Sequence, residues 1–196
     1  MSDPWASLTG KDGKGKGGQS AKAAKQISTR LNRIHRDTWV EPFLGVGNVY
    51  RATKPSKREI LNDLDCKRTR ETRRRFCGLK GKEKCARLRA ARLTCGKDYK
   101  GFLSRYDKKG TLIYLDPPYH DRTRNQTYGK TGLDFNRFVL SVRGIKNACV
   151  AISYSNNPEF KREFCGSKGG YRCHSIKKSI FRDHYTEILA IKKARC

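Results

Sequence analysis

A proline-stiffened acidic turn, Asp116-Pro117-Pro118-Tyr119, follows the apolar run 111–115. Each proline fixes φ and lacks an N–H donor, so the turn offers hydrogen-bond acceptors and little else. The Asp116 carboxylate and the Pro117 carbonyl could together accept both hydrogens of one amino group. Tyr119 adds a flat face on which a nucleobase could stack, a contact worth roughly 1–3 kcal/mol. The turn therefore predicts a site that handles an amino group on a planar base.

A glycine turn and an acid lie at the ends of two earlier predicted strands. Gly45 and Gly47 follow a short strand expected at 38–41, and glycine there lets the backbone approach a ligand that a Cβ would hit. Asp63 ends a second strand expected at 58–63, where its carboxylate could accept hydrogen bonds from a ribose. The order of strand, glycine turn, helix, strand and acid is typical of half a mononucleotide-binding fold.

Hydrophobic periodicity predicts the elements that must position these residues. The further expected elements are helices after Ser20 and at 135–145, and strands at 111–115, 148–154, 171–177 and 186–191. Crossover connections followed by an antiparallel end predict an α/β fold whose sheet is mostly parallel, with an antiparallel terminal strand. In such a sheet the ligand lies outside the carboxyl ends of the strands, where all three chemical segments fall.

The chain is strongly basic, with 45 Lys+Arg against 18 Asp+Glu and a net charge of +27 over 196 residues, which favours a nucleic-acid partner. Residues 66–97 hold 13 Lys+Arg against 2 Glu and too few apolar residues for a core of their own. We interpret them as a short basic insertion, mostly helical from about 83 to 93, although a solvated face without a partner is the alternative. Its candidate phosphate contacts are Arg73, Arg74, Arg75, Lys82, Lys84 and Arg87.

The cysteines and the apolar runs exclude other classes. No two of the 8 cysteines are separated by only two residues, so the tight pairs of zinc modules are missing; we expect reduced thiols and no metal. The longest apolar runs are too short to span a bilayer, and no charged-then-apolar leader opens the chain. We therefore expect no membrane partner and a location in the cytoplasm of a bacterial or phage-infected cell.

Three motifs together resemble those of the Dam-like DNA adenine-N6 methyltransferases, which use S-adenosylmethionine. Glu41-Pro42-Phe43-Leu44-Gly45-Val46-Gly47 is similar to the family's cofactor motif, Leu61-Asn62-Asp63 to its ribose acid, and Asp116-Pro117-Pro118-Tyr119 to its catalytic turn. The motifs keep the family's order, and the similarity covers roughly residues 17–64 and 98–192. The resemblance implies a Rossmann-like methyltransferase fold that transfers a methyl group to adenine N6 in double-stranded DNA.

The resemblance also implies roles for particular residues and a division of the chain. Asp116, Pro117, Pro118 and Tyr119 would be catalytic, with the target base extruded from the duplex. The implied cofactor contacts are Gly17, Gly18, Glu41, Pro42, Phe43, Gly45, Gly47, Asp63 and Asp98. The expected parts are a flexible basic segment at 1–19, a catalytic domain formed by 20–65 and 98–196, and a target-recognition insertion at 66–97, together acting as a monomer.

Two alternatives stay open, and the first of them follows from a departure from the family. The family's Gly-Gly-Lys is Gly17-Gly18-Gln19 here, so its lysine is missing or is supplied by Lys16 or Lys22. One alternative is a catalytically impaired nucleic-acid-binding protein with the same fold. The other is methyl transfer to RNA or to cytosine N4, because the geometry of the acidic turn tolerates any amino acceptor.

Overall fold

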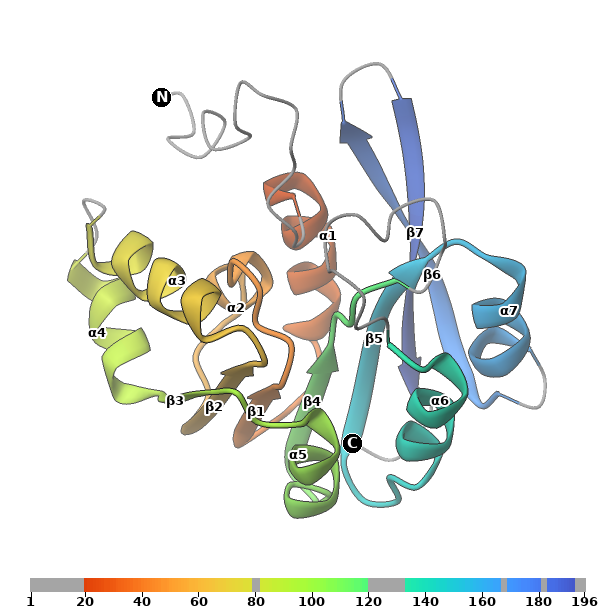
Figure 1. The fold of residues 1–196 in the computed structure, drawn as a ribbon. Helices are drawn as coiled ribbons and strands as arrows, with labels where there is room; N and C mark the ends of the chain where they lie inside the picture. The colour runs from red at the N-terminus through yellow and green to blue at the C-terminus, as the bar shows by residue number, and fades with distance from the viewer. Residues whose placement is uncertain (1–19, 79–81, 120–132, 167–168, 181–182, 193–196) are drawn as a thin grey trace.

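The computed structural model describes residues 20–78, 82–119, 133–166, 169–180 and 183–192, and they form a sheet covered by helices on both faces (Figure 1). Its seven strands have the order β3-β2-β1-β4-β5-β7-β6. The pairs β3–β2, β2–β1, β1–β4 and β4–β5 are parallel, whereas β7 runs antiparallel to both β5 and β6. The predicted α/β fold with an antiparallel terminal strand is confirmed.

Most elements lie where the hydrophobic pattern predicted them, but the strand at 92–95 was not predicted. The strands are β1 Thr38–Glu41, β2 Arg58–Asp63, β3 Arg92–Cys95, β4 Thr111–Leu115, β5 Cys149–Ser155, β6 Tyr171–Ile180 and β7 Asp183–Lys192. The helices are α1 Ala21–Leu31, α2 Asn48–Ala52, α3 Cys66–Gly78, α4 Lys82–Ala90, α5 Tyr99–Arg105, α6 Phe135–Arg143 and α7 Pro158–Phe160, which the π-helical turn Lys161–Cys165 extends.

Two helices show why the sequence folds locally as it does. The Ser20 hydroxyl caps α1 by accepting a hydrogen bond from the Ala23 amide at 3.2 Å, and the Asp134 carboxylate caps α6 through the Arg137 amide at 3.0 Å. Each helix then buries one apolar stripe at a spacing of three or four residues. The buried residues are Ala24, Ile27 and Leu31 in α1, and Phe135, Phe138, Val139 and Val142 in α6.

Each face of the sheet has its own apolar core. Helices α1 to α4 contribute to a core that contains Trp39 and Tyr114, while α5, α6 and α7 contribute to a core that contains Val40 and Ile113. Because neighbouring strand residues point to opposite faces, the central strands β1 and β4 are buried on both sides. The sheet is therefore a rigid platform for whatever lies at its edges.

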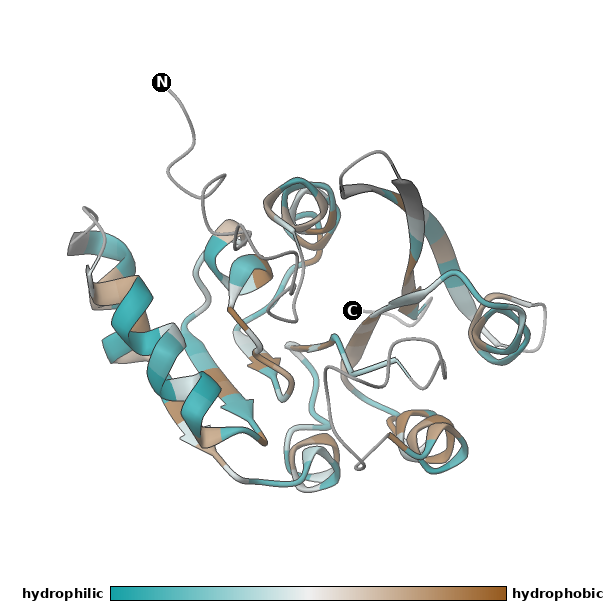
Figure 2. Ribbon diagram, turned by 45° about the horizontal axis from the view of Figure 1, so that its top comes forward, coloured by the Kyte–Doolittle hydropathy of each residue, from teal (hydrophilic) through white to brown (hydrophobic). Residues whose placement is uncertain are grey.

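The basic span 66–97 holds the crossover helices α3 and α4 that connect β2 to β3, and β3 itself. The helix expected to reach residue 93 ends at Ala90, and Arg92–Cys95 joins the sheet because it pairs with Ile60–Asp63 of β2. Phe76 of α3 and Leu88 of α4 are buried in the core that contains Trp39 and Tyr114. This explains how the span folds with so few apolar residues. Figure 2 shows that the rest of α3 and α4 is largely hydrophilic.

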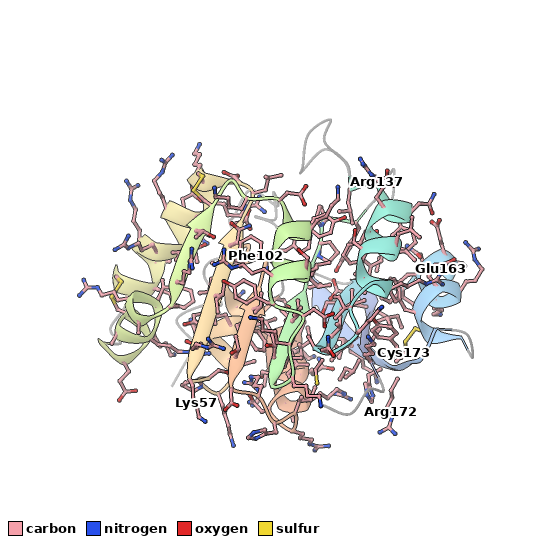
Figure 3. The ribbon with its side chains drawn as sticks, turned by 90° about the horizontal axis from the view of Figure 1, so that it is seen from below. Lys57, Phe102, Arg137, Glu163, Arg172 and Cys173 are labelled. Atoms are coloured by element: carbon pink, nitrogen blue, oxygen red, sulfur yellow. A yellow bond between two sulfur atoms is a disulfide. The ribbon has the colours of Figure 1, made fainter. Side chains whose placement is uncertain are left out.

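The prediction of reduced cysteines was wrong. Disulfides join Cys66 to Cys95, Cys77 to Cys85, and Cys165 to Cys173. Cys173 is labelled in Figure 3. Cys149 is also disulfide-bonded, and the described residues hold no free cysteine. Cys66–Cys95 is possible because the β2–β3 pairing returns the chain to the start of α3. Disulfides are rare in reducing compartments, so the thiols no longer support a cytoplasmic location.

The described residues include neither a membrane-spanning helix nor a cluster of metal ligands. Within the described ranges no helix is both long enough and apolar enough to cross a bilayer. In the same part of the chain, no three His, Cys, Asp or Glu side chains gather as metal ligands would. The expectation that the protein needs no metal stays a prediction.

Candidate active site

The three chemical segments meet at one edge of the sheet. Val40 of β1 lies opposite Ile113 of β4, and Glu41 lies opposite Leu61 of β2. Because these strands are parallel, the glycine turn after β1, the acid that ends β2 and the acidic turn after β4 leave the sheet side by side (Figure 1). The sequence order thus becomes a spatial cluster at the carboxyl ends of the central strands.

The glycine turn is held from two sides. Its Gly45 amide donates a hydrogen bond of 2.7 Å to the Asp63 carboxylate, and the Gly45 carbonyl accepts one of 2.8 Å from the Thr72 hydroxyl of α3. Gly45 and Gly47 have φ of 54° and 69°, a region that favours glycine. Burial raises the pKa of Asp63, and the hydrogen bonds from the Asp65 and Gly45 amides oppose that rise. Asp63 therefore shapes the turn, whatever ligand it also contacts.

Replacing Gly47 by alanine tests how tightly this turn is packed. A Cβ at Gly47 would lie 3.1 Å from the Phe76 ring, in a backbone conformation that L residues rarely adopt. We expect Gly47→Ala to lower the free energy of unfolding by about 1–2 kcal/mol in a urea titration. Gly101→Ala, in α5 with nothing within 4 Å of the added Cβ, is the control and should be neutral or stabilising. Equal effects of the two changes would contradict this packing.

Glu41 is a buried acid between the glycine turn and the acidic turn. It is only 2% exposed, and it accepts a hydrogen bond of 3.0 Å from the Trp39 indole. Burial raises the pKa of Glu41 well above its usual range, and the nearby charge of Asp116 raises it further. Glu41 and Asp116, which the sequence predicted to share a site, are thus close enough to interact.

A pocket with a volume of about 240 Å³ lies at this edge of the sheet. Its lining residues are Pro42, Phe43, Leu64, Lys97, Asp98, Tyr99, Lys100, Pro118, Leu133, Asp134 and Arg137. Asp98 caps α5 by accepting a hydrogen bond of 2.8 Å from the Lys100 amide, so it is both a helix cap and a pocket residue. The Phe43 and Tyr99 rings lie 5.2 Å apart and form an aromatic wall. The pocket joins the predicted cofactor segment to the acidic turn.

Tyr119 is fixed at its hydroxyl and along its ring edge. Its hydroxyl donates a hydrogen bond to the Glu187 carboxylate of β7, and its ring packs edge-on against Tyr154, with centroids 5.0 Å apart. Burial raises the pKa of Tyr119 well above its usual range, and the charges of Glu187 and Asp116 add to this effect. Glu187 was not identified as a site residue from the sequence. The signal that could have indicated it is a single acidic residue within the apolar strand predicted at 186–191.

The predicted phosphate contacts do not all face solvent. Arg73, Arg74 and Lys84 are exposed and Arg75 is half-buried. The assignment of Arg87 as a nucleic-acid contact was wrong, because its side chain points inward and pairs with buried Glu59 at 2.7 Å. The Lys82 side chain, and Gly17 and Gly18 of the predicted cofactor contacts, lie outside the described residues, as does the basic segment 1–19.

Known structures with this architecture identify the fold. A methyltransferase from Geobacter sulfurreducens is 11% identical with a TM-score of 0.62, and the match covers 99% of this chain and 91% of the other. Cofactor-bound Rv0187 from MTB is 13% identical with a TM-score of 0.61, covering 99% and 92%. The O-methyltransferase TomG from Streptomyces achromogenes, solved in complex with SAM, is 12% identical with a TM-score of 0.60, covering 90% and 82%.

The class defined by these likenesses is structural. No protein-family model matches the chain, and no curated protein sequence is similar to it. At 11–13% identity the similar structures establish the fold alone. The chain has the Rossmann-like methyltransferase fold.

Proposed function

We propose that this chain transfers a methyl group from S-adenosylmethionine to the N6 amino group of adenine in double-stranded DNA. The observation that carries the proposal is the juxtaposition of Asp116-Pro117-Pro118-Tyr119 with the glycine turn at the carboxyl ends of β4 and β1. The methyltransferase fold supports methyl transfer in general. The acidic turn supports an amino acceptor, and the net charge of +27 supports a nucleic acid.

The residues at this edge fit the proposed cofactor. When bound, S-adenosylmethionine supplies an electrophilic methyl group on a positively charged sulfonium. The site gathers the acids Glu41, Asp63 and Asp116 in a chain with more than twice as many basic as acidic residues. The Asp116 carboxylate suits a cation and that of Asp63 suits ribose hydroxyls, whereas buried Glu41, with its raised pKa, suits the role of an uncharged hydrogen-bonding group. Leu64 is 66% exposed at the pocket, an apolar surface suited to a planar ring. The cofactor-binding residues are Glu41, Pro42, Phe43, Gly45, Gly47, Asp63 and Asp98.

The acidic turn supplies positioning. The lone pair of an adenine amino group is delocalised into its ring, which makes the nitrogen a poor nucleophile. Asp116 and the Pro117 carbonyl would accept hydrogen bonds from the two N–H groups of this amino group. They would thereby favour a pyramidal nitrogen and direct its lone pair toward the methyl group. The negative charge of Asp116 would also stabilise the positive charge that develops on the nitrogen as the N–C bond forms and the sulfonium C–S bond breaks to release S-adenosylhomocysteine. The Asp116 carboxylate could then pass the surplus N–H proton to solvent. Catalysis then depends mainly on orientation and electrostatics, which a fixed turn provides.

A labelled-methyl assay tests the reaction. The protein is incubated with methyl-labelled S-adenosylmethionine and unmethylated duplex DNA, the same DNA denatured, or a structured RNA. We expect incorporation into the duplex. Incorporation into RNA alone would favour the RNA alternative, while DNA binding without any incorporation would favour the impaired nucleic-acid-binding protein.

Three consecutive arginines of α3, of which Arg73 and Arg74 are exposed, give a second prediction. Changing Arg73, Arg74 and Arg75 to alanine should weaken DNA binding and flatten its dependence on salt, by roughly 0.9 in slope for each lost phosphate contact. The matched control changes Arg105, Lys108 and Lys109, three exposed cations near the start of β4, at the opposite edge of the sheet. Binding titrations over a salt series measure both slopes. Equal slopes for the two triple variants would show that α3 contacts no phosphate.

A further inference from the structure

A buried acid lies beneath the acidic turn, and the proposed reaction does not yet use it. Glu187 of β7 is 4% exposed and sits opposite Ser155, the last residue of β5, so it reaches the same edge of the sheet as Asp116. The residues that follow it, Ile188, Leu189 and Ala190, are buried and apolar. Burying a carboxylate in such surroundings is unfavourable unless hydrogen bonds compensate. Stability alone would favour an apolar side chain here.

The hydrogen bond of Glu187 fixes a residue of the acidic turn. The Tyr119 hydroxyl donates to the Glu187 carboxylate across 68 positions of sequence. Tyr154 packs against the Tyr119 ring at 64° and stacks on Phe160 at 4.9 Å, so this support is itself rigid. The hydrogen bond at the hydroxyl and the packing along one side of the ring together fix the orientation of the Tyr119 side chain. Tyr119 thus keeps a defined position before any base arrives.

We propose that Glu187 is a positioning residue for the target base, acting through Tyr119. This inference rests on the proposed function, in which the extruded base stacks on Tyr119. By holding the phenol, Glu187 sets the plane on which the base lies and therefore the direction of its amino group toward Asp116. A small error in that direction lowers the rate more than the affinity, because near-attack geometry is needed only for the chemical step. The site therefore extends from β4 to the terminal strand β7.

The test is a double-mutant cycle on turnover. Glu187→Leu and Tyr119→Phe should each lower kcat about tenfold or more on unmethylated duplex DNA, with the KM for S-adenosylmethionine and the DNA affinity nearly unchanged. The double variant should be no slower than either single variant, because both remove the same hydrogen bond. Glu187→Gln keeps an acceptor oxygen and should recover most of the activity. Glu163→Gln, an acid on the outer π-helical turn that pairs with Arg143 at 2.8 Å, is the control (Figure 3).

The outcomes separate this role from the reaction itself. A wild-type chain that methylates no acceptor would overturn the proposed function and this role with it. Wild-type kcat in Glu187→Leu, or single losses that multiply in the double variant, would overturn the role of Glu187 alone. Cofactor binding by each variant, measured by calorimetry, shows whether it is folded. A variant that loses both cofactor binding and turnover would make Glu187 a structural residue and would also contradict the inference.

Discussion

Asp116→Ala should lower kcat for methyl transfer by about 100-fold or more, because it removes both the principal acceptor for the amino group and the charge that stabilises the reacting nitrogen. DNA affinity should stay within a few-fold, since the basic surface supplies most of the binding energy. Single-turnover transfer and a binding titration on the same duplex measure the two quantities. Asp116→Asn, which retains one acceptor oxygen, should be slower than the wild type but faster than the alanine variant.

A matched control separates catalysis from loss of a surface charge. Asp37 precedes β1 at the opposite edge of the sheet and pairs with exposed Lys57 at 2.9 Å. Asp37→Ala should leave transfer unchanged, because exposed ion pairs contribute little to stability. Normal turnover in Asp116→Ala would remove the catalytic assignment of the acidic turn.

Arg87→Met should lower the free energy of unfolding by about 3–5 kcal/mol, because it leaves the buried Glu59 carboxylate without its counter-charge. The guanidinium lies 4.1 Å from the centre of the Tyr50 ring and donates to the carbonyls of Tyr50 and Thr53 at 2.9 and 2.7 Å. The Tyr50 hydroxyl donates to Glu59 at 2.7 Å. Arg87 therefore anchors α4 to α2 and β2. Urea unfolding measures the loss.

Two companion variants make this result specific. Arg87→Met combined with Glu59→Leu should recover much of the lost stability, because the double change removes both buried charges. Arg89→Met, on an exposed position of the same helix, should be nearly neutral. If Arg87→Met were as stable as the wild type and instead flattened the salt dependence of DNA binding, the original assignment of Arg87 would be right.

The sequence predicted the sheet well because its strands carry local signals. Runs such as 111–115 and 148–154 are apolar and bounded by turn residues, and the strands lie at Thr111–Leu115 and Cys149–Ser155. The glycine turn and the acidic turn were found for a similar reason, because the glycine and proline residues of a short motif restrict the local backbone conformation. The convergence of Glu41 and Asp116 then followed from strand order, because parallel strands deliver their carboxyl ends to one edge.

What the sequence missed depends on partners far along the chain. In the sequence Arg87 looked like its exposed neighbours. Folding brings it against the buried acid Glu59, which lies 28 positions earlier in the chain. Cys66 and Cys95 pair because β3 joins the sheet, and four residues rich in polar side chains gave little sign of a strand. Glu187 gained meaning only through its contact with Tyr119. Spacing rules describe neighbours in sequence, whereas these three features are set by tertiary packing.

The most direct test of the central claim is the chemical identity of the product. Unmethylated duplex DNA treated with the protein and S-adenosylmethionine is digested to nucleosides and analysed by mass spectrometry, with Asp116→Ala as the blank. We expect N6-methyladenine from the wild type and none from the variant. N4-methylcytosine would keep the site and change the acceptor, whereas unmodified nucleosides from both proteins, with every acceptor tried, would contradict the account.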